Sequence, residues 1–355
     1  MGKAGQKSAD NNHRVVASIA TLPKIVLHDH LDGGVRVQTM VDLAARVGGE
    51  LDGMEPAEVS AVLRHGAGTQ RSLVSYLEAF PLVTSLLRTT DDLQRVAREA
   101  VTDLAQDGTV HAEIRFAPQL YSCWGIALDD AVEAVADGAL SESRRLGISA
   151  GVLVCGMRDQ KNLSDLATKV KRWYSSGQIL GFDLAGDEFG HPVTKHEEVL
   201  KWLTLADVPL TIHAGESASW KSVKDALDAT YWRTRIGHGV RSVENTEFLS
   251  ELAERAVHLE VCPSSNLHTG VYNSIAEHPI DRLLEAGVQV SISADNRTMS
   301  DTSVSSELIL LSQTFGWGLK EIYATQRYAL TAANCSESVK AEVSAALDRW
   351  IFSES

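Results

Sequence analysis

The sequence predicts an α/β fold in which eight parallel strands alternate with helices. Short runs rich in Val, Ile, Leu and Phe recur eight times, amphipathic segments separate them, and polar side chains follow most of the runs. Strands that alternate with helices form parallel βαβ units, and eight such units in an undivided chain predict a (β/α)8 TIM barrel. A doubly wound open sheet is the alternative. Its first strand usually leads into a Gly-rich loop, but "HDHLDGG" contains no GxGxxG.

The predicted strands and helices follow one another along most of the chain. The strands are Ile25–His30, Val110–Ala117, Ser149–Gly156, Gly181–Ala185, Pro209–His213, Thr234–Gly237, Val257–Cys262 and Val288–Ser293. The segment "TDDLQRVAREAVTDLAQDG" carries an apolar stripe of helical period, with Thr90 as the expected cap at its start and Gly108 at its end. The segments "LDDAVEAVADGALSESRRLG", which ends at Gly147, and "SVENTEFLSELAER" repeat this pattern.

Two stretches exceed what a simple barrel needs. The section from Gln38 to Gly108 is too long for one crossover, so extra helices are expected over the barrel mouth after the first strand. Residues 302–351 are expected to form further helices at the C-terminus. We expect residues 1–20 to be a flexible N-terminal segment and residues 21–355 to form a single barrel domain.

The net charge, the apolar runs and the cysteine usage indicate which classes of partner and which cellular compartment to expect. The 355 residues carry a net charge of −14, from 33 basic and 47 acidic side chains, so nucleic acid and membranes are not expected partners. No apolar run approaches the ~18 residues of a membrane span, and no signal-peptide core is visible. The four cysteines are widely spaced without a CxxC pair, and Cys155 and Cys262 lie in apolar runs. This usage predicts a cytoplasmic protein with buried thiols; the oligomeric state is left open.

The stretch "KIVLHDHLDGG" places two histidines one residue apart after an apolar run. Side chains alternate along a strand, so His28, His30 and, if the strand continues, Asp32 lie on one face. Three polar groups on one face of a buried strand are costly unless something satisfies them.

The later strands also end in polar side chains, and the C-terminal ends of barrel strands converge on one site. The segments concerned are "GFDLAGDE" with Asp183, Gly186, Asp187 and Glu188, "TIHAGE" with His213 and Glu216, "RIGHGV" with His238, and "SISADN" with Asp295 and Asn296. Three imidazoles and one carboxylate suit Zn²⁺, and the set His28, His30, His213 and Asp295 leaves room for a water. Zinc lowers the pKa of such a water to roughly 7. Glu216 and His238 are then the candidates for the acid and the base.

Each of these signals is weak by itself. A lone HxH pair is as well explained by packed or surface histidines, and an aspartate at a strand end is often a helix cap. The joint occurrence in barrel order favours a metal site. The remaining histidines fit no such pattern and are expected on the surface or in packing roles: His13, His65, His111, His191, His196, His258, His268 and His278.

The chain resembles the adenosine deaminase family of metal-dependent amidohydrolases, in its bacterial branch. The matching segments run in family order from Pro23 to about Asn296: "PKIVLHDHLDGG", "SLVSYLEAF", "HAEIRFAP", "GFDLAGDE", "TIHAGE", "RIGHGV", "LEVCPSSN" and "SISADN". The resemblance implies hydrolytic loss of ammonia from C6 of adenosine or 2′-deoxyadenosine, with one Zn²⁺ per chain.

The same resemblance implies a role for each site residue. His28, His30, His213 and Asp295 would bind zinc, with Asp295 also part of the catalytic set, while Glu216 would protonate N1 and His238 would orient or deprotonate the zinc-bound water. Asp32 would hold the ribose 5′-hydroxyl, the Gly186 backbone would meet the N3 edge of the purine, and His30 would line the sugar side.

One position departs from the family pattern. Members often have Asp-Asp where this chain has Asp295-Asn296, and the second residue is expected to face the acceptor N7. An Asn donates through its NH₂ group without needing a proton, so the change fits a purine but removes a titrating group.

Three readings of the function stay open at this point. A carboxylate at Asp32 would repel a 5′-phosphate, which favours a nucleoside over AMP. Adenine or a modified 6-aminopurine nucleoside is the alternative substrate. A catalytically inactive zinc-binding barrel is a third reading, but such a protein would be expected to lose Glu216 or His238, and both are present.

Overall fold

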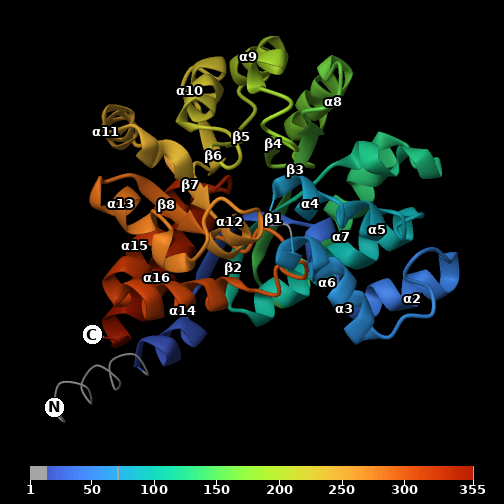
Figure 1. Cartoon of the computed structure of the whole chain (residues 1–355), viewed down its shortest axis with the longest axis horizontal. Coiled ribbons are helices and arrows are strands. Elements are labelled where there is room, and N and C mark those ends of the chain that lie inside the picture. Colours follow the sequence, from blue (N-terminus) through green and yellow to red (C-terminus); the bar gives the residue numbers. More distant parts are fainter. Residues whose placement is uncertain (1–13, 70–71, 355) are drawn as a thin grey trace.

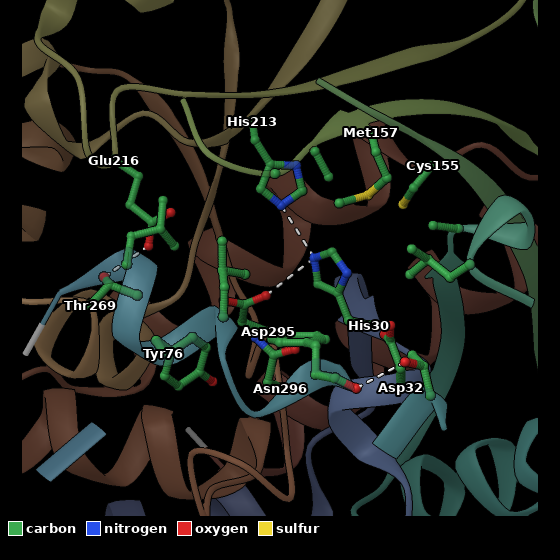
Figure 2. A pocket seen from close by; sticks show the side chains of 18 of the residues that line it. His30, Asp32, Tyr76, Cys155, Met157, His213, Glu216, Thr269, Asp295 and Asn296 are labelled. Carbon is green, nitrogen blue, oxygen red and sulfur yellow. Dashed lines mark hydrogen bonds and ion pairs between the residues drawn. The ribbon is translucent and has the colours of Figure 1, made fainter. Parts of the chain in front are cut away.

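The computed structural model describes residues 14–69 and 72–354, and the eight predicted strands are all present in it. They form one sheet in the order β1 to β8, in which every neighbouring pair is parallel. A bridge between Asp29 and Asp295 joins the first strand to the segment after the last. The predicted (β/α)8 TIM barrel is therefore confirmed. Figure 1 shows the helices arranged around the strands. The strands are β1 (Lys24–His30), β2 (Thr109–Phe116), β3 (Ser149–Met157), β4 (Gly181–Ala185), β5 (Leu210–Ala214), β6 (Thr234–His238), β7 (His258–Val261) and β8 (Gln289–Ile292).

Helices connect successive strands on the outside of the barrel. These are α7 (Leu128–Leu146), α8 (Ser164–Ser175), α9 (Glu197–Leu205), α10 (Trp220–Ala229), α11 (Thr246–Glu254) and α13 (Ile280–Glu285). The short helix α12 (Pro263–His268), which follows β7, lies over the barrel mouth instead. Buried side chains such as Val135, Val170 and Leu200 form the apolar stripes by which they pack. The terminal helices expected over residues 302–351 are α14 (Val304–Phe315), α15 (Leu319–Ala332) and α16 (Glu337–Glu354).

The long connection from β1 to β2 contains the extra helices that its length predicts. They are α2 (Val37–Val47), α3 (Pro56–Thr69), α4 (Leu73–Leu77), α5 (Phe80–Thr84) and α6 (Thr90–Gln106). Side chains of α4 and α5 line the cavity at the barrel mouth, so this insertion covers the end of the barrel where the polar strand ends meet.

The structure differs from the sequence expectations at the starts of two helices. Helix α6 is capped by Thr89, not Thr90. Thr89 Oγ1 accepts a hydrogen bond from the Asp92 N–H at 3.2 Å, and Asp92 Oδ2 accepts one from the Thr89 N–H. Helix α11 begins only after Asn245, which accepts the Phe248 N–H. Residues 14–21 are helical, with Ile19 fully buried. Of the N-terminal segment 1–20, residues 1–13 lie outside the described chain.

Two further sequence expectations concern thiols and membranes. Cys155 and Cys262 are buried, as expected, and all four cysteines are free. Within residues 14–69 and 72–354, no helix combines the length and the apolar character that crossing a bilayer requires.

Candidate active site

Four side chains from three parts of the barrel meet at its C-terminal end. His28 and His30 come from β1, His213 from β5, and Asp295 from the segment after β8. One ligand atom of each lies within 4.8 Å of the others. His30 Nε2 is 3.2 Å from His213 Nε2, and Asp295 Oδ1 is 3.4 Å from Nε2 of both His28 and His30. Atoms that share a zinc ion at ~2.0–2.2 Å in tetrahedral geometry lie roughly 3.3–3.6 Å apart, so these spacings fit such an ion.

The hydrogen-bond state of His28 supports the same fit. The ring is fully buried, and its Nε2 has no hydrogen-bond partner among the described residues. Its Nδ1 lies 2.9 Å from Glu260 Oε2, so the ring proton belongs on Nδ1 and the lone pair of Nε2 points to the cluster. A buried nitrogen lone pair that has no hydrogen-bond partner and lies beside two other imidazoles is the arrangement expected of a metal ligand.

His213 is oriented by a second buried carboxylate in the same way. Its Nδ1 lies 3.0 Å from Asp183 Oδ1. One guanidinium then joins the two carboxylates, because Arg115 donates to Asp183 Oδ2 at 3.0 Å and to Glu260 Oε2 at 2.8 Å. Arg115 also donates to the Leu27 carbonyl, next to His28. The three charged side chains are fully buried, so their mutual pairing is required to offset desolvation.

Two site residues have backbone conformations that side-chain-bearing residues rarely adopt. Asp295 has φ 62° and His238 has φ 61°. Residues in this left-handed region cost on the order of 1–3 kcal/mol and persist where the surroundings fix them. In both cases the conformation turns a side chain at a strand end toward the cavity.

The short helix α12 and the residue after it contact three site residues. Ser265 Oγ donates to Asp295 Oδ2 at 2.6 Å, and Thr269 Oγ1 donates to Glu216 Oε1 at 2.9 Å. Asn266 Nδ2 lies 3.2 Å from His238 Nδ1. Ser265 therefore occupies one oxygen of Asp295 and leaves the other directed at the histidines.

The carboxyl group of Glu216 lies in a buried position beside His238. Its Oε2 is 3.6 Å from His238 Nε2. Burial, with the nearby charge of Asp295, raises the pKa of Glu216 to about 8. Glu216 is therefore a neutral acid at neutral pH in this environment, as its expected role requires.

The loop that carries Glu216 is held by another carboxylate of the "GFDLAGDE" segment. Glu188 is buried and accepts the backbone N–H groups of the whole turn after β5, at 2.6–3.1 Å: those of Gly215, Glu216, Ser217 and Ala218. On the other side, Arg241 Nε donates to the Glu216 carbonyl at 2.7 Å. These bonds hold the turn in one conformation, so the acid is presented by a rigid element.

A cavity of about 240 Å³ extends from this acid and the metal-ligand cluster to Asp32. Its apolar wall comes from α4, α5 and neighbouring strands, and includes Leu77, Phe80 and Met157. Among residues 14–69 and 72–354, those that line it include no Lys or Arg. Burial raises the pKa of Asp32 to about 6. The Gly33 N–H donates a hydrogen bond to Asp32 Oδ1 at 3.2 Å.

Two further expected contacts lie on the cavity wall. Gly186 has φ 105°, a conformation that favours glycine and leaves its backbone open to the cavity. Asn296 is buried, and its Oδ1 has no hydrogen-bond partner among the described residues. A side chain on Gly33 would collide with this amide, because an added Cβ would lie 1.9 Å from Oδ1.

A comparison with protein families matches residues 23–350 to the model described as adenosine deaminase. This chain belongs to the adenosine deaminase family. An adenosine deaminase from Mycobacteroides abscessus is 38% identical over 335 residues, which are 89% of this chain and 91% of that one.

Among solved structures, an adenine deaminase from Arthrobacter aurescens superposes with a TM-score of 0.85 at 26% identity, over 93% of this chain and 99% of the other. An amidohydrolase from Burkholderia ambifaria, solved with bound Zn, gives the same TM-score and identity over 97% and 94% of the two chains.

The adenosine deaminase-type barrel brings together the residues that the sequence predicted to catalyse the reaction, bind the substrate or bind the metal. The cavity wall contains all of them except His28, which lies behind it in the metal-ligand cluster: His30, Asp32, Gly186, His213, Glu216, His238, Asp295 and Asn296.

Sequence reasoning missed the residues that orient this set. Asp183 and Glu188 were recognised as polar strand ends but not assigned a partner. Glu260 and Arg115 gave no signal, because a charged residue inside a strand is read as a solvent-facing side chain unless its partners are known. Asn266 and Thr269 lie in and just after α12, whose orientation only the tertiary structure defines.

Proposed function

We propose that the protein hydrolyses adenosine and 2′-deoxyadenosine to inosine, or 2′-deoxyinosine, and ammonia, using one Zn²⁺ per chain. The observation that carries the proposal is the position of Glu216. This buried carboxyl group, with a pKa raised to about 8, faces the same cavity as the cluster of three histidines and Asp295. Family membership supports the same reaction.

Glu216 is proposed to supply the proton that makes the purine reactive. C6 of adenine is a poor electrophile, and protonation of N1 draws electron density from it. A neutral carboxylic acid can donate that proton, and its carboxylate can then accept one from the water that adds to C6. The same group passes this proton to the amine, so the C6–N bond breaks and ammonia leaves, and Glu216 then takes up the proton of the C6 hydroxyl as C6=O forms. Water, purine and acid then balance without another proton donor.

His28, His30, His213 and Asp295 would hold the zinc ion. When bound, zinc would lower the pKa of water and so make a nucleophile available at neutral pH. Asp295 and His238 line the cavity on the side of this cluster, where they can contact the oxygen that adds to C6. Within this proposal, Asp295 is both a ligand and a member of the catalytic set.

The opposite end of the cavity is proposed to bind the sugar. The Asp32 carboxylate can accept a hydrogen bond from a 5′-hydroxyl, and His30 lies between it and His213, another member of the metal-ligand cluster. The Gly186 backbone would meet the N3 edge of the purine. Asn296 would donate its NH₂ group to N7.

Adenine and AMP are less well matched to this cavity than the nucleoside is. Adenine, the substrate named for the Arthrobacter relative, has no sugar hydroxyl to donate to the buried Asp32 carboxylate. A 5′-phosphate would meet Asp32, and the described part of the cavity wall contains no Lys or Arg to offset its charge. The presence of both Glu216 and His238 argues against an inactive barrel.

The setting of the reaction is part of the same proposal. Four free thiols support the cytoplasm as the compartment. The net charge of −14 argues against nucleic acid or membrane surfaces as partners.

The experiment is a substrate panel with purified zinc-loaded protein. Adenosine, 2′-deoxyadenosine, adenine and AMP are compared by kcat/KM, from ammonia release and ultraviolet absorbance. The two nucleosides are expected to be the best substrates. Faster turnover of adenine or AMP would overturn the assignment of Asp32 to the sugar.

A further inference from the structure

Asn266 lies between two buried histidines, only one of which faces the cavity. Its Nδ2 is 3.2 Å from His238 Nδ1, and its Oδ1 is 3.2 Å from His278 Nε2. The exposed fractions of His238, Asn266 and His278 are 1%, 0% and 3%. The three side chains therefore form a hydrogen-bonded row that starts at His278, outside the active site, and ends at His238.

Two proton arrangements are possible in such a row, and they run in opposite directions. In the first, His278 donates to the amide oxygen and the amide NH₂ donates to His238. In the second, the amide is turned over, so that His238 donates and His278 accepts. The two arrangements leave the proton of neutral His238 on different nitrogens, and the amide orientation follows from which histidine is the donor.

The surroundings of His278 decide between the two arrangements. Its Nδ1 is buried and has no hydrogen-bond partner among the described residues, and its ring packs edge-on against Tyr272. Burial lowers the pKa of His278 to about 3, so the ring carries one proton. A proton on Nδ1 would be a buried donor without an acceptor, which is costly, whereas a proton on Nε2 is bonded to Asn266 Oδ1.

We propose that Asn266 and His278 are positioning residues that fix His238 in the tautomer with its proton on Nε2. The amide NH₂ donates to the Nδ1 lone pair of His238, so the remaining ring proton must lie on Nε2. This atom is the one that lies 3.6 Å from Glu216 Oε2, on the cavity side.

The consequence rests on the proposed deamination. His238 then enters the reaction as a hydrogen-bond donor to the oxygen that adds to C6, and it does not take the proton from the water. That proton goes to Glu216, which is a carboxylate once it has protonated N1. Of the two roles that the resemblance leaves open for His238, orienting the water or deprotonating it, the row of hydrogen bonds selects the first.

The direct test is the tautomer of His238, measured by nitrogen NMR of zinc-loaded protein with ¹⁵N-labelled histidine. A His238→Gln variant assigns the resonances. We expect a pyridine-like Nδ1 and a protonated Nε2. The converse pattern in the unaltered protein would overturn the proposal, whether or not the protein deaminates adenosine. Conversely, the expected pattern in a protein that leaves adenosine unchanged would support the tautomer and refute the proposed function.

The substitution Asn266→Asp is expected to reverse the hydrogen bond between residue 266 and His238, with little change in side-chain shape. A carboxylate accepts a hydrogen bond from His238 Nδ1–H, so the proton is expected to move to Nδ1. The expected loss of kcat is on the order of a hundredfold, the effect of removing one donor from a developing oxyanion, with KM nearly unchanged. Retention of the Nε2–H pattern and of kcat in this variant would contradict the proposal.

A matched pair at His278 separates the hydrogen bond from packing. His278→Gln keeps a donor for Asn266 Oδ1 and is expected to retain the tautomer and most of kcat, whereas His278→Phe keeps the ring and is expected to give mixed tautomers and a lower kcat. Ser264→Ala, in helix α12 with Asn266, is the control that should change neither readout. Thermal unfolding and zinc content check that each variant is folded and loaded. Equal behaviour of the Gln and Phe variants would refute the role of His278.

Discussion

His30 Nε2 and His213 Nε2 lie 3.2 Å apart at the mouth of the barrel. The proton of His213 is bound at Nδ1 by Asp183, so its Nε2 presents a lone pair to its neighbour. Asp295 adds a carboxylate oxygen 3.4 Å from His30 Nε2. His213 Nε2 and Asp295 Oδ1 are thus two acceptors that converge on His30 Nε2, which carries at most one proton and cannot satisfy both. A cation bound by all three atoms satisfies this buried arrangement.

Glu216→Gln tests the acid. The amide keeps the shape and the Thr269 contact but cannot protonate N1, so kcat is expected to fall by roughly 10²–10⁴-fold while zinc content is unchanged. Steady-state kinetics and metal analysis on the same preparation check both points. A Gln variant that retains most of its activity would remove Glu216 from the acid role.

The raised pKa of Glu216 also predicts how stability changes with pH. The folded pKa of about 8 lies above the usual value of 4.5, so the folded state holds a proton that the unfolded state releases between these values. Glu216 therefore contributes less and less to the free energy of unfolding as pH rises from about 4.5 to about 8. In metal-free protein, Glu216→Gln should gain stability relative to the unaltered chain across this range, measured by urea unfolding. A difference independent of pH would show that Glu216 titrates normally.

Asp32→Asn tests recognition of the sugar. The amide has nearly the same volume but loses the charge-assisted hydrogen bond to a 5′-hydroxyl, so KM for adenosine should rise by roughly tenfold. The 5′-deoxy analogue of adenosine lacks that hydroxyl, and its KM should change little. Parallel losses for both compounds would mean that Asp32 acts on the cavity as a whole and not on the 5′ position.

Arg115→Lys tests the support behind the metal ligands. A lysine keeps the positive charge but cannot bond to Asp183 and Glu260 together as the guanidinium does. Partners of metal ligands are commonly worth 10–100-fold in metal affinity, and we expect a loss of about this size in a zinc competition assay. Lys24→Met is the control, because Lys24 is a buried cation bonded to the Ile19 and Leu22 carbonyls. The Lys24→Met variant should have a lower free energy of unfolding and an unchanged zinc affinity.

The extent to which the sequence predicts this site follows from barrel geometry. Residues at the ends of strands can be assigned to one site without coordinates, because all C-terminal ends of the strands open on the same face, and His213 and Asp295 were identified in this way. Arg115 and Glu260 lie inside strands, and their pairing depends on which residues face each other across the barrel. His278 was expected to be a packing residue; its contact with Asn266 depends on how α12 and the following loop fold back.

The exact ends of helices were also harder to predict from the sequence than the helices themselves. Thr89 and Thr90 are equally good caps by composition, and only the backbone conformation selects Thr89. The apolar stripe of α6, in contrast, was evident from the spacing of residues such as Leu93 and Val101, because burial on one helix face imposes its period on the sequence.

The most direct test of the central claim is zinc content measured together with activity during chelation. We expect about one zinc per folded chain, loss of adenosine deamination when a chelator removes the metal, and recovery when zinc is restored. A chain that is folded and free of metal, yet releases ammonia from adenosine at the original rate, would contradict it.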